Sequence, residues 1–566
     1  MGLRERIGSS GVLMRVLSDD RVMKLTNGVM DARNRLRVAG DIVGQAWVVI
    51  RDGQALPSID PALEGSDADV VDSAKRAPAK SNGAGAHGGS NGVNGYAAAA
   101  GAQPAAARKP QDGEASEAVA DRPHIVAESG EGAAPAAPAP KPVGPRNASE
   151  ADLAQSMAER ASLAKVGGKD IFDKCYKFMT ADNARAMGVY PFFRPLDFNN
   201  GPIAQLEGRE VIMLGSNNYL GLTTHPKVRE AAKAAIDKYG TSMTGSRLVN
   251  GSMRLHEELE HKLAAFHGKE AGLVFTTGYQ VNIATISALL SNKSSVGVID
   301  KDVHASIYDG IRLGLANKAR MVRYKHNDPD SLDDALSEIG DTEGALVITD
   351  GVFSAQGEIA HLPGLVEKVK KHNARIFVDD AHGLGVLGPS GRGTAAELGV
   401  ADKVDLIGGT FSKSLASIGG WLVGDRKVLD YIRHFAFSFL FAASAAPPCV
   451  AAAMAALEVM QEETWRQQKL RENFTYMRNE LRGMGFELGT TQTAVIPIYI
   501  RQDLRTVMMW KSLLDDYSIY VNPFITPGVP PKQQVLRTSY MATHERQHLD
   551  RALEAFQKVG KKFGVI

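Results

Sequence analysis

The chain has 566 residues, of which 44% are apolar and 23% charged, so it can hold several domains and a large core. The net charge of +1 lacks the basic excess of a dedicated nucleic-acid-binding protein, and only two cysteines are present, which excludes a disulfide framework and indicates a reducing compartment. No His or Cys spacing typical of a metal site occurs, and the N-terminus lacks the apolar segment of a secretory signal, so we expect a cytoplasmic protein without a bound metal.

Two segments of different composition come first. Residues 1–56 place scattered apolar side chains among charged ones, which is typical of one or two amphipathic helices. Residues 57–145 consist mainly of Ala, Gly, Pro, Ser and charged residues and nearly lack aromatic side chains. Such a segment cannot bury enough apolar surface to offset the entropy lost on ordering, so we expect a disordered linker.

The rest of the chain alternates short apolar runs with helical patterns, which predicts an α/β fold with a largely parallel sheet. Ligands of such sheets bind at the carboxyl ends of the strands. The expected strands are 271–275, 295–299, 345–348, 375–378 and 404–407, and the expected helices between them are 254–265, 279–290, 329–339 and 365–372.

An uncharged stretch from Phe435 to Leu457 is long enough to cross a bilayer. It is rich in alanine and contains Pro447-Pro448, so we expect a buried loop and helix of a large core instead. Beyond Phe435 we expect a long helix and then a smaller α/β domain with strands near 494–499 and 535–539.

Two strand ends carry the residues on which the functional prediction depends. The strand at 375–378 leads to Asp379 and His382, and the next strand leads to Lys413, which lies among glycines and hydroxyl side chains. An amine, a carboxylate and hydroxyls at neighbouring strand ends are what pyridoxal 5'-phosphate (PLP) requires: the lysine forms a Schiff base, the carboxylate keeps the ring nitrogen protonated, and hydroxyls bind the phosphate.

Two other nucleotide motifs fail in this region. A Walker A loop requires glycines where Ser412 and Ile407 stand. The Gly-x-Gly-x-x-Gly pattern at 383–388 is followed by Pro389 and further helix-breaking residues, whereas a dinucleotide site needs those glycines to open a helix.

Three more strand-to-helix junctions join this constellation. Gly278 and Tyr279 open a helix, where their amides could hold a phosphate at the positive helix end. His304 follows the strand at 295–299, and Ser354 lies in the junction after the strand at 345–348. Each residue alone is typical of an ordinary loop, but their convergence beside Asp379 and Lys413 favours one site.

From about Phe172 to Ile566 the chain resembles the α-oxoamine synthases, PLP enzymes of fold type I that condense an amino acid with an acyl thioester and release carbon dioxide. Within that family it is most similar to the bacterial serine palmitoyltransferases, because Phe-x-Lys-Ser surrounds Lys413 where relatives that use glycine or alanine have Gly-Lys-Ala. The matching strings are Gly215–Gly221, Gly245–Gly251, His304–Gly310, Gly409–Ser414, Leu536–Ser539 and Val559–Ile566.

The resemblance implies a role for each site residue. Lys413 would be the catalytic lysine, and Asp379 the carboxylate that pairs with the ring nitrogen. His304 would stack on the ring, and His382 would bind the ring hydroxyl. Ser354 would share the ring hydroxyl, Arg537 would bind the substrate carboxylate, and Asn218 would assist. The phosphate contacts would be Gly278, Tyr279, Thr410 and Ser412.

The resemblance also implies domains, substrates and assembly. We expect an N-terminal arm at 146–215, a PLP-binding domain at 216–455 and a small domain at 456–566. The expected substrates are L-serine and a long-chain acyl-CoA or acyl carrier protein, used by a cytoplasmic homodimer that contacts the inner membrane face peripherally. Two alternatives stay open: a sister synthase of the 8-amino-7-oxononanoate synthase or 2-amino-3-ketobutyrate CoA ligase type, and a non-catalytic regulatory subunit.

The sequence departs from the serine palmitoyltransferase pattern at two places. Ala442 stands where those enzymes usually carry a threonine that reaches the phosphate across the dimer interface. The loop 522–528 lacks the arginine that those enzymes tend to have.

Overall fold

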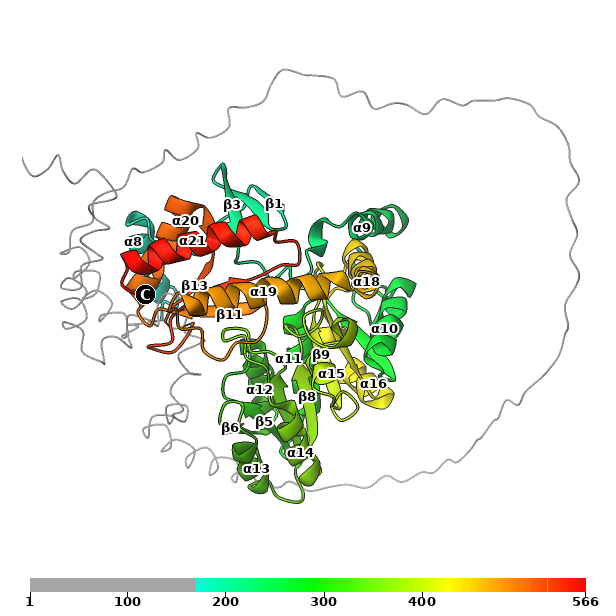
Figure 1. The fold of residues 1–566 in the computed structure, drawn as a ribbon. Helices are drawn as coiled ribbons and strands as arrows, with labels where there is room; N and C mark the ends of the chain where they lie inside the picture. Colours follow the sequence, from blue (N-terminus) through cyan, green and yellow to red (C-terminus); the bar gives the residue numbers. More distant parts are fainter. Residues whose placement is uncertain (1–168, 527) are drawn as a thin grey trace, which may run out of the picture. The chain divides into compact units, whose positions relative to one another are not determined.

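The structure is a computed structural model that describes residues 169–526 and 528–566 (Figure 1). The predicted segments 1–56 and 57–145, and the first part of the predicted arm at 146–215, lie outside the described residues.

A seven-stranded sheet lies within residues 216–455, the predicted PLP-binding domain, and its strand order is β4-β10-β9-β8-β7-β5-β6. β10 runs antiparallel to both of its neighbours, and the other strands are parallel. The predicted, mostly parallel α/β sheet is therefore confirmed. The bounds are β4 (Ala271–Phe275), β5 (Ser295–Asp300), β6 (Arg320–Tyr324), β7 (Gly344–Asp350), β8 (Arg375–Asp379), β9 (Leu406–Thr410) and β10 (Gly420–Gly424).

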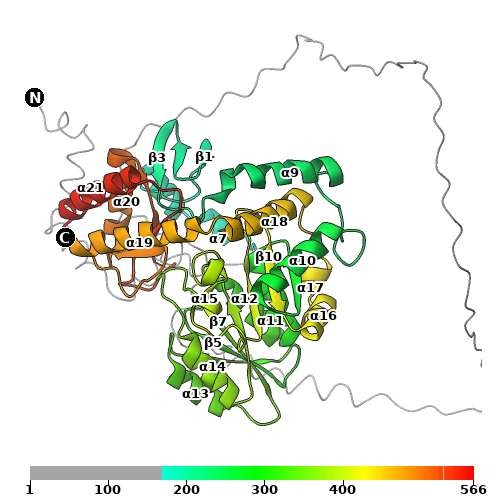
Figure 2. The same cartoon turned by 45° about the vertical axis from the view of Figure 1, so that its right-hand side comes forward.

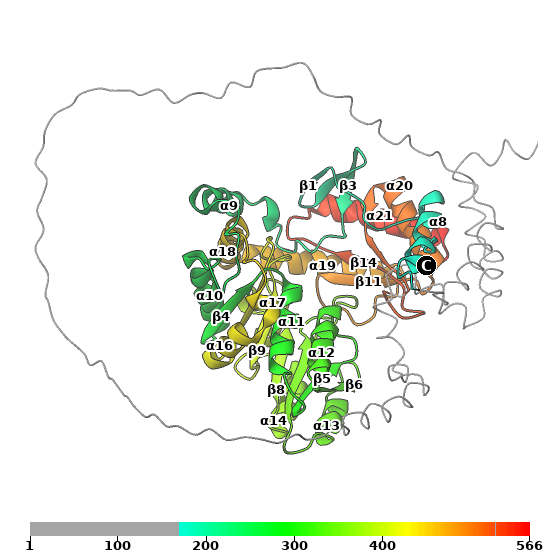
Figure 3. The ribbon, with the colours of Figure 1, turned by 180° about the vertical axis from the view of Figure 1, so that it is seen from behind.

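Helices cover both faces of this sheet, as Figure 3 shows from behind. Side chains alternate between two apolar cores along each strand: Phe377 of β8 packs in one core, while Ile376 and Val378 pack in the other. The helices of this part are α10 (Arg254–His267), α11 (Gly278–Leu289), α12 (Ala305–Ala316), α13 (Pro329–Ser337), α14 (Leu362–Lys371), α15 (Thr394–Glu397) and α16 (Arg426–Phe435), with a 3-10 turn η4 at Pro389–Gly391.

The uncharged stretch after Phe435 differs from its prediction. It contains the short helix α17 (Phe437–Leu440), a loop, and α18 (Pro447–Glu462), whose alanine-rich faces are buried. The start of this stretch is not buried as expected, because Phe437 in α17 and Phe441 directly after it are 72% and 74% exposed. Within the described part of the chain, no helix has the length and apolar character needed to cross a membrane.

The remainder is built around two helices in place of the one predicted long helix, α18 and α19 (Trp465–Gly483), and α9 (Pro226–Tyr239) packs along α18 (Figure 2). The predicted small domain at 456–566 holds the antiparallel sheet β11-β14-β13 (Val495–Tyr499, Val535–Ser539, Asn522–Phe524) with α20 (Asp503–Tyr517) and α21 (Arg546–Lys562). Strands β1 (Phe198–Asn200), β2 (Ile203–Leu206) and β3 (Arg209–Met213) of the arm join β12 (Ile519–Tyr520) of the small domain in one sheet. Short elements complete the fold: α7 (Asp173–Tyr176), α8 (Thr180–Ala186) and η3 (Leu222–Thr224).

Candidate active site

A cavity of about 360 Å³ opens at the carboxyl ends of β7, β8 and β9, beside the first residues of α11 and α12. Nine of the eleven predicted site residues line it, and Asn218 and Arg537 do not. The nine are Gly278, Tyr279, His304, Ser354, Asp379, His382, Thr410, Ser412 and Lys413.

The carboxylate of Asp379 is fixed on both oxygens. Asn282 of α11 donates its side-chain amide to Oδ2 at 2.6 Å, and the backbone amide of Ala381 donates to Oδ1 at 3.1 Å. Asn282 also donates to the hydroxyl of Ser306 at 2.7 Å and is only 2% exposed. The sequence prediction missed Asn282, because only the packing of α11 against the sheet brings it to Asp379.

A second carboxyl group lies beside Asp379. Asp350 ends β7, and the strand register places it directly opposite Asp379. Burial, reinforced by the negative charge of Asp379, raises the pKa of Asp350 well above its usual range. The backbone amide of His304 donates to Asp350 at 3.4 Å, which ties the His304 turn to the end of β7. Asp350 was not predicted as a site residue, although the junction that contains it was noted.

Lys413 carries an amine that is easily deprotonated. Burial, together with the nearby charge of Arg537, lowers the pKa of Lys413 to about 8, against the opposing attraction of Asp379 and Asp350. A buried amine with this pKa is uncharged in a useful fraction of molecules near neutral pH. An uncharged amine is the form that attacks a carbonyl carbon.

His382 is held as a neutral, oriented ring. Burial, with the charges of Lys413 and Arg537, lowers the pKa of His382 well below its usual range. Its Nδ1 lies 2.7 Å from the hydroxyl of Tyr219, and burial raises the pKa of that tyrosine to about 12. The same hydroxyl donates to Oδ1 of Asn217 at 3.2 Å, so Tyr219 ties the imidazole of His382 to the asparagine that contacts Arg537.

Arg537 reaches the edge of the cavity from β14 of the small domain. Its Nε donates to the carbonyl oxygen of Ser354 at 2.6 Å, and both terminal nitrogens donate to Oδ1 of Asn217 at 3.2 Å. Nη1 also donates to the hydroxyl of Ser539 at 3.0 Å. These partners are all neutral and Arg537 is only 3% exposed, so the charge fits an anionic ligand such as a carboxylate.

The structure places Asn218 in a different setting from the one expected. Its side-chain oxygen accepts from the amide of Leu222 at 3.0 Å, and its side-chain nitrogen donates to the hydroxyl of Thr223 at 2.8 Å. Both ends therefore stabilise a local turn. The neighbouring Asn217, which the prediction omitted, is the asparagine that contacts Arg537.

The start of α11 forms an anion cradle with the end of β9. A Cβ atom on Gly278 would lie 2.6 Å from Cβ of Thr410, so only glycine allows the helix to begin this close to the strand. The hydroxyls of Thr410 and Ser412 lie 2.8 Å apart next to these helix-terminal amides. Amides at a positive helix end and two hydroxyls fit a phosphate group. The hydroxyl of Tyr279 is bonded to Asp309, so Tyr279 would contribute its backbone amide.

Comparison with known proteins identifies the family. Residues 209–556 match the model of the aminotransferase class I and II family. A serine palmitoyltransferase of Sphingobacterium spiritivorum is 43% identical over 68% of this chain and 95% of its own length. A high-resolution structure of SPT with a PLP internal aldimine superposes with a TM-score of 0.67, at 34% identity over 70% of this chain and all of the other. The 8-amino-7-oxononanoate synthase of Thermoanaerobacter pseudethanolicus is 38% identical over 68% of this chain and 96% of its own length.

The chain belongs to the aminotransferase class I and II family. This membership confirms the predicted resemblance to the α-oxoamine synthases close to serine palmitoyltransferase, and with it fold type I and PLP as the cofactor. The cavity fits PLP by its own chemistry, because it offers a nucleophilic lysine, a fixed carboxylate and an anion cradle in one place. The roles of the individual residues remain predictions.

The lowered pKa of Lys413 makes a prediction about the cofactor-free protein. Between pH about 8 and about 10.4 the unfolded chain binds a proton at this lysine that the folded chain does not, so wild-type stability should rise with pH across that window. Lys413→Met should lack this rise and be more stable than wild type at pH 7 by about 3 kcal/mol. Urea unfolding of both proteins across the window measures the difference. A Lys413→Met protein that is less stable at pH 7, or that follows the same pH curve, would contradict the burial of this charge.

Proposed function

We propose that the protein condenses L-serine with a long-chain acyl thioester, with loss of carbon dioxide and release of the free thiol, to give 3-ketodihydrosphingosine, the first step of sphingolipid synthesis. The observation that carries this proposal is Arg537, a buried cation that donates hydrogen bonds to the neutral groups of Ser354, Asn217 and Ser539, at the edge of the cavity that holds Lys413. An amino-acid carboxylate supplies the missing negative charge.

The residues of the chain divide the work as follows. When bound, PLP supplies an electrophilic carbonyl and a ring that accepts the electron pair released at the substrate Cα. Lys413 binds the cofactor and then removes and returns the proton at Cα, for which a pKa of about 8 is well matched. Asp379, fixed by Asn282, would keep a proton on the ring nitrogen, and His304, which lines the cavity, would cover one ring face.

Ring orientation and carboxylate position come from the remaining residues. His382 and Ser354 would hydrogen-bond the ring hydroxyl of the cofactor, and the contact of Tyr219 with Nδ1 orients the imidazole of His382. Arg537 orients the serine carboxylate, first to aim the Cα–H bond and later to hold the group that leaves as carbon dioxide.

Two alternatives to this function are a sister synthase and a non-catalytic subunit. A sister synthase that uses glycine or alanine would need the same lysine, aspartate and arginine, and the 38% identity to an 8-amino-7-oxononanoate synthase keeps it open. The 43% identity to a serine palmitoyltransferase and the Phe411–Ser414 string favour serine. A non-catalytic subunit has no need of a buried lysine whose pKa is lowered, so we do not favour it.

Substrate choice is tested by amino-acid titration of the PLP-loaded protein. Serine should perturb the visible cofactor band at lower concentration than glycine or alanine, and acyl-CoA and acyl carrier protein donors of different lengths should then separate by product mass. Arg537→Ala should weaken serine binding by about 1.5–3 kcal/mol, because a charged hydrogen bond is lost. Arg505→Ala, on α20, is the control and should leave binding unchanged. Higher turnover with glycine or alanine than with serine would overturn the substrate proposal and leave the PLP chemistry intact.

We further propose a homodimer whose subunits meet over an apolar patch next to the cavity. The patch consists of Leu248, Val249, Ile418, Phe437 and Phe441, which are 55–74% exposed. A bridge between Ser246 and Ala443 joins the two loops that carry most of it, and Ile418 also lines the cavity. A second copy seated here would cover both the patch and the cavity mouth, next to Ala442.

The choice between acyl-CoA and acyl carrier protein as donor, the cytoplasmic location and the peripheral membrane contact also remain predictions.

The dimer proposal is tested by replacing two patch residues. Phe437→Ser with Phe441→Ser should give a monomer that binds PLP weakly, because an apolar interface of this kind is stabilised mainly by burial. Sedimentation and cofactor titration measure both effects. Leu504→Ser, an exposed apolar position away from the patch, is the control. A dimer that survives the double substitution with full PLP affinity would contradict this placement of the interface.

A further inference from the structure

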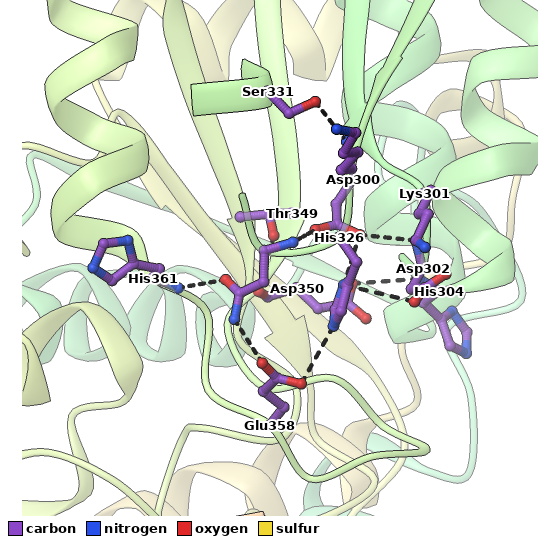
Figure 4. A network of polar contacts seen from close by, with 12 residues as sticks. Asp300, Lys301, Asp302, His304, His326, Ser331, Thr349, Asp350, Glu358 and His361 are labelled. Atoms are coloured by element: carbon purple, nitrogen blue, oxygen red, sulfur yellow. Dashed lines mark hydrogen bonds and ion pairs between the residues drawn. The ribbon is translucent and has the colours of Figure 1, made fainter. Parts of the chain in front are cut away.

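A cluster of ionisable side chains lies behind the cavity wall, where His326 faces three carboxylates (Figure 4). Nδ1 of His326 lies 3.0 Å from Asp300 and 3.7 Å from Asp302, and Nε2 lies 3.5 Å from Glu358. The His326 side chain is 17% exposed and that of Asp300 is fully buried. None of these residues belongs to the predicted site.

The cluster joins the ends of three strands through backbone contacts as well. Asp300 ends β5, and its carboxylate accepts from the amides of Asp302 at 2.8 Å and Asn327 at 2.7 Å. The side chain of Asn327 donates to Glu358 at 3.1 Å and to the carbonyl of Ile359 at 3.0 Å. The pair His326-Asn327, which follows β6, therefore holds the turn after β5 and the turn after β7 at once.

Each of these turns presents a residue to the cavity. His304 follows Asp302 by two residues, and its ring lines the cavity. Ser354 lies in a tight turn in which Phe353 donates its amide to the carbonyl of Glu358 at 2.9 Å. The ring of Phe353 packs edge-on against His326, with 4.3 Å between ring centroids. A displacement of Asp302 or Glu358 would therefore shift His304 or Ser354.

The charges around His326 favour its protonated form. The facing groups are the carboxylates of Asp300, Asp302 and Glu358, with Lys301 near Asp302 and the hydroxyls of Tyr324 and Tyr499 near these carboxylates. Burial acts to lower the pKa of His326, but the hydrogen bond to Asp300 and the charges of the carboxylates outweigh it and raise the pKa above its usual value. A neutral ring would leave three carboxylates crowded together.

We propose that His326, as a cation between Asp300, Asp302 and Glu358, is a positioning residue that locks the turns carrying His304 and Ser354 in the geometry that binds the cofactor. This proposal rests on the proposed function only in treating His304 and Ser354 as cofactor contacts. The contribution of the cation to stability is fully present below the unfolded pKa of about 6.5 and is lost as pH rises through the higher folded pKa. The two turns therefore loosen as pH rises through the folded pKa of His326.

The first test is amide hydrogen exchange in the cofactor-free, full-length protein. His326→Gln should speed exchange about tenfold in peptides covering 300–306 and 352–358, and not in the strand 375–379. The matched control is His372→Gln, because His372 also pairs with a carboxylate, at 2.7 Å from Asp333, with a side chain 21% exposed but away from the cavity. If His326→Gln does not fold, Glu358→Gln should give the same local pattern. Unchanged exchange in both turns would overturn the proposal.

The second test is PLP affinity as a function of pH. His326→Gln should bind PLP about tenfold more weakly than wild type near pH 6.5, and the two proteins should converge as pH rises, since wild type loses its cation. The ratio of the two affinities isolates His326 from the titration of Lys413. A ratio that is constant with pH would show a purely structural role and overturn the proposal. Failure of wild type to bind PLP at all would overturn the proposed function. The exchange experiment would still test whether His326 holds the two turns in place.

Discussion

The structure depends on one constraint, the strand register that brings the carboxyl ends of the parallel strands β7, β8 and β9 to the same edge of the sheet. The register pairs Asp350 with Asp379 and Asp379 with Gly408, so the residues that follow these strands emerge side by side. Because the strands are parallel and buried on both faces, only this edge can display polar groups together. The carboxylates, the lysine five residues beyond Gly408 and the histidine after Asp379 meet for this reason alone.

This edge concentrates buried charges at a cost in stability. Lys413 and Arg537 are both basic groups in a buried setting, and burial, reinforced by the charge of Asp379, raises the pKa of Asp350. Burial shifts the pKa of each of these groups in the direction that favours its neutral form, which is unfavourable for folding. The same burial gives Lys413 a nucleophilic amine and makes the binding of an anion beside Arg537 favourable. The ionic cluster around His326 lies one layer further out and holds the turns that carry His304 and Ser354.

The sequence predicted the residues that periodicity and local chemistry reveal, and missed those that packing alone decides. The strand at 271–275 was predicted with its observed bounds because its apolar run is unbroken. β10 was missed because Gly420 and Gly424 at its ends read as turn residues, and its antiparallel insertion has no local signal. Asn282 and Asn217 were missed because their contacts with Asp379 and Arg537 span 97 and 320 residues of chain. Phe437 and Phe441 were predicted to be buried but are exposed. The apolar content of a segment does not distinguish a side chain buried in the core of its own chain from one on the surface.

The central claim is that Lys413 binds PLP covalently, and it can be tested directly. The PLP-loaded protein should be reduced with borohydride and digested, and the peptides should be sequenced by mass spectrometry. We predict one pyridoxyl adduct, on Lys413, and none in Lys413→Ala. An adduct on another lysine, or a reduced protein that carries no adduct, would contradict the assignment of the active site.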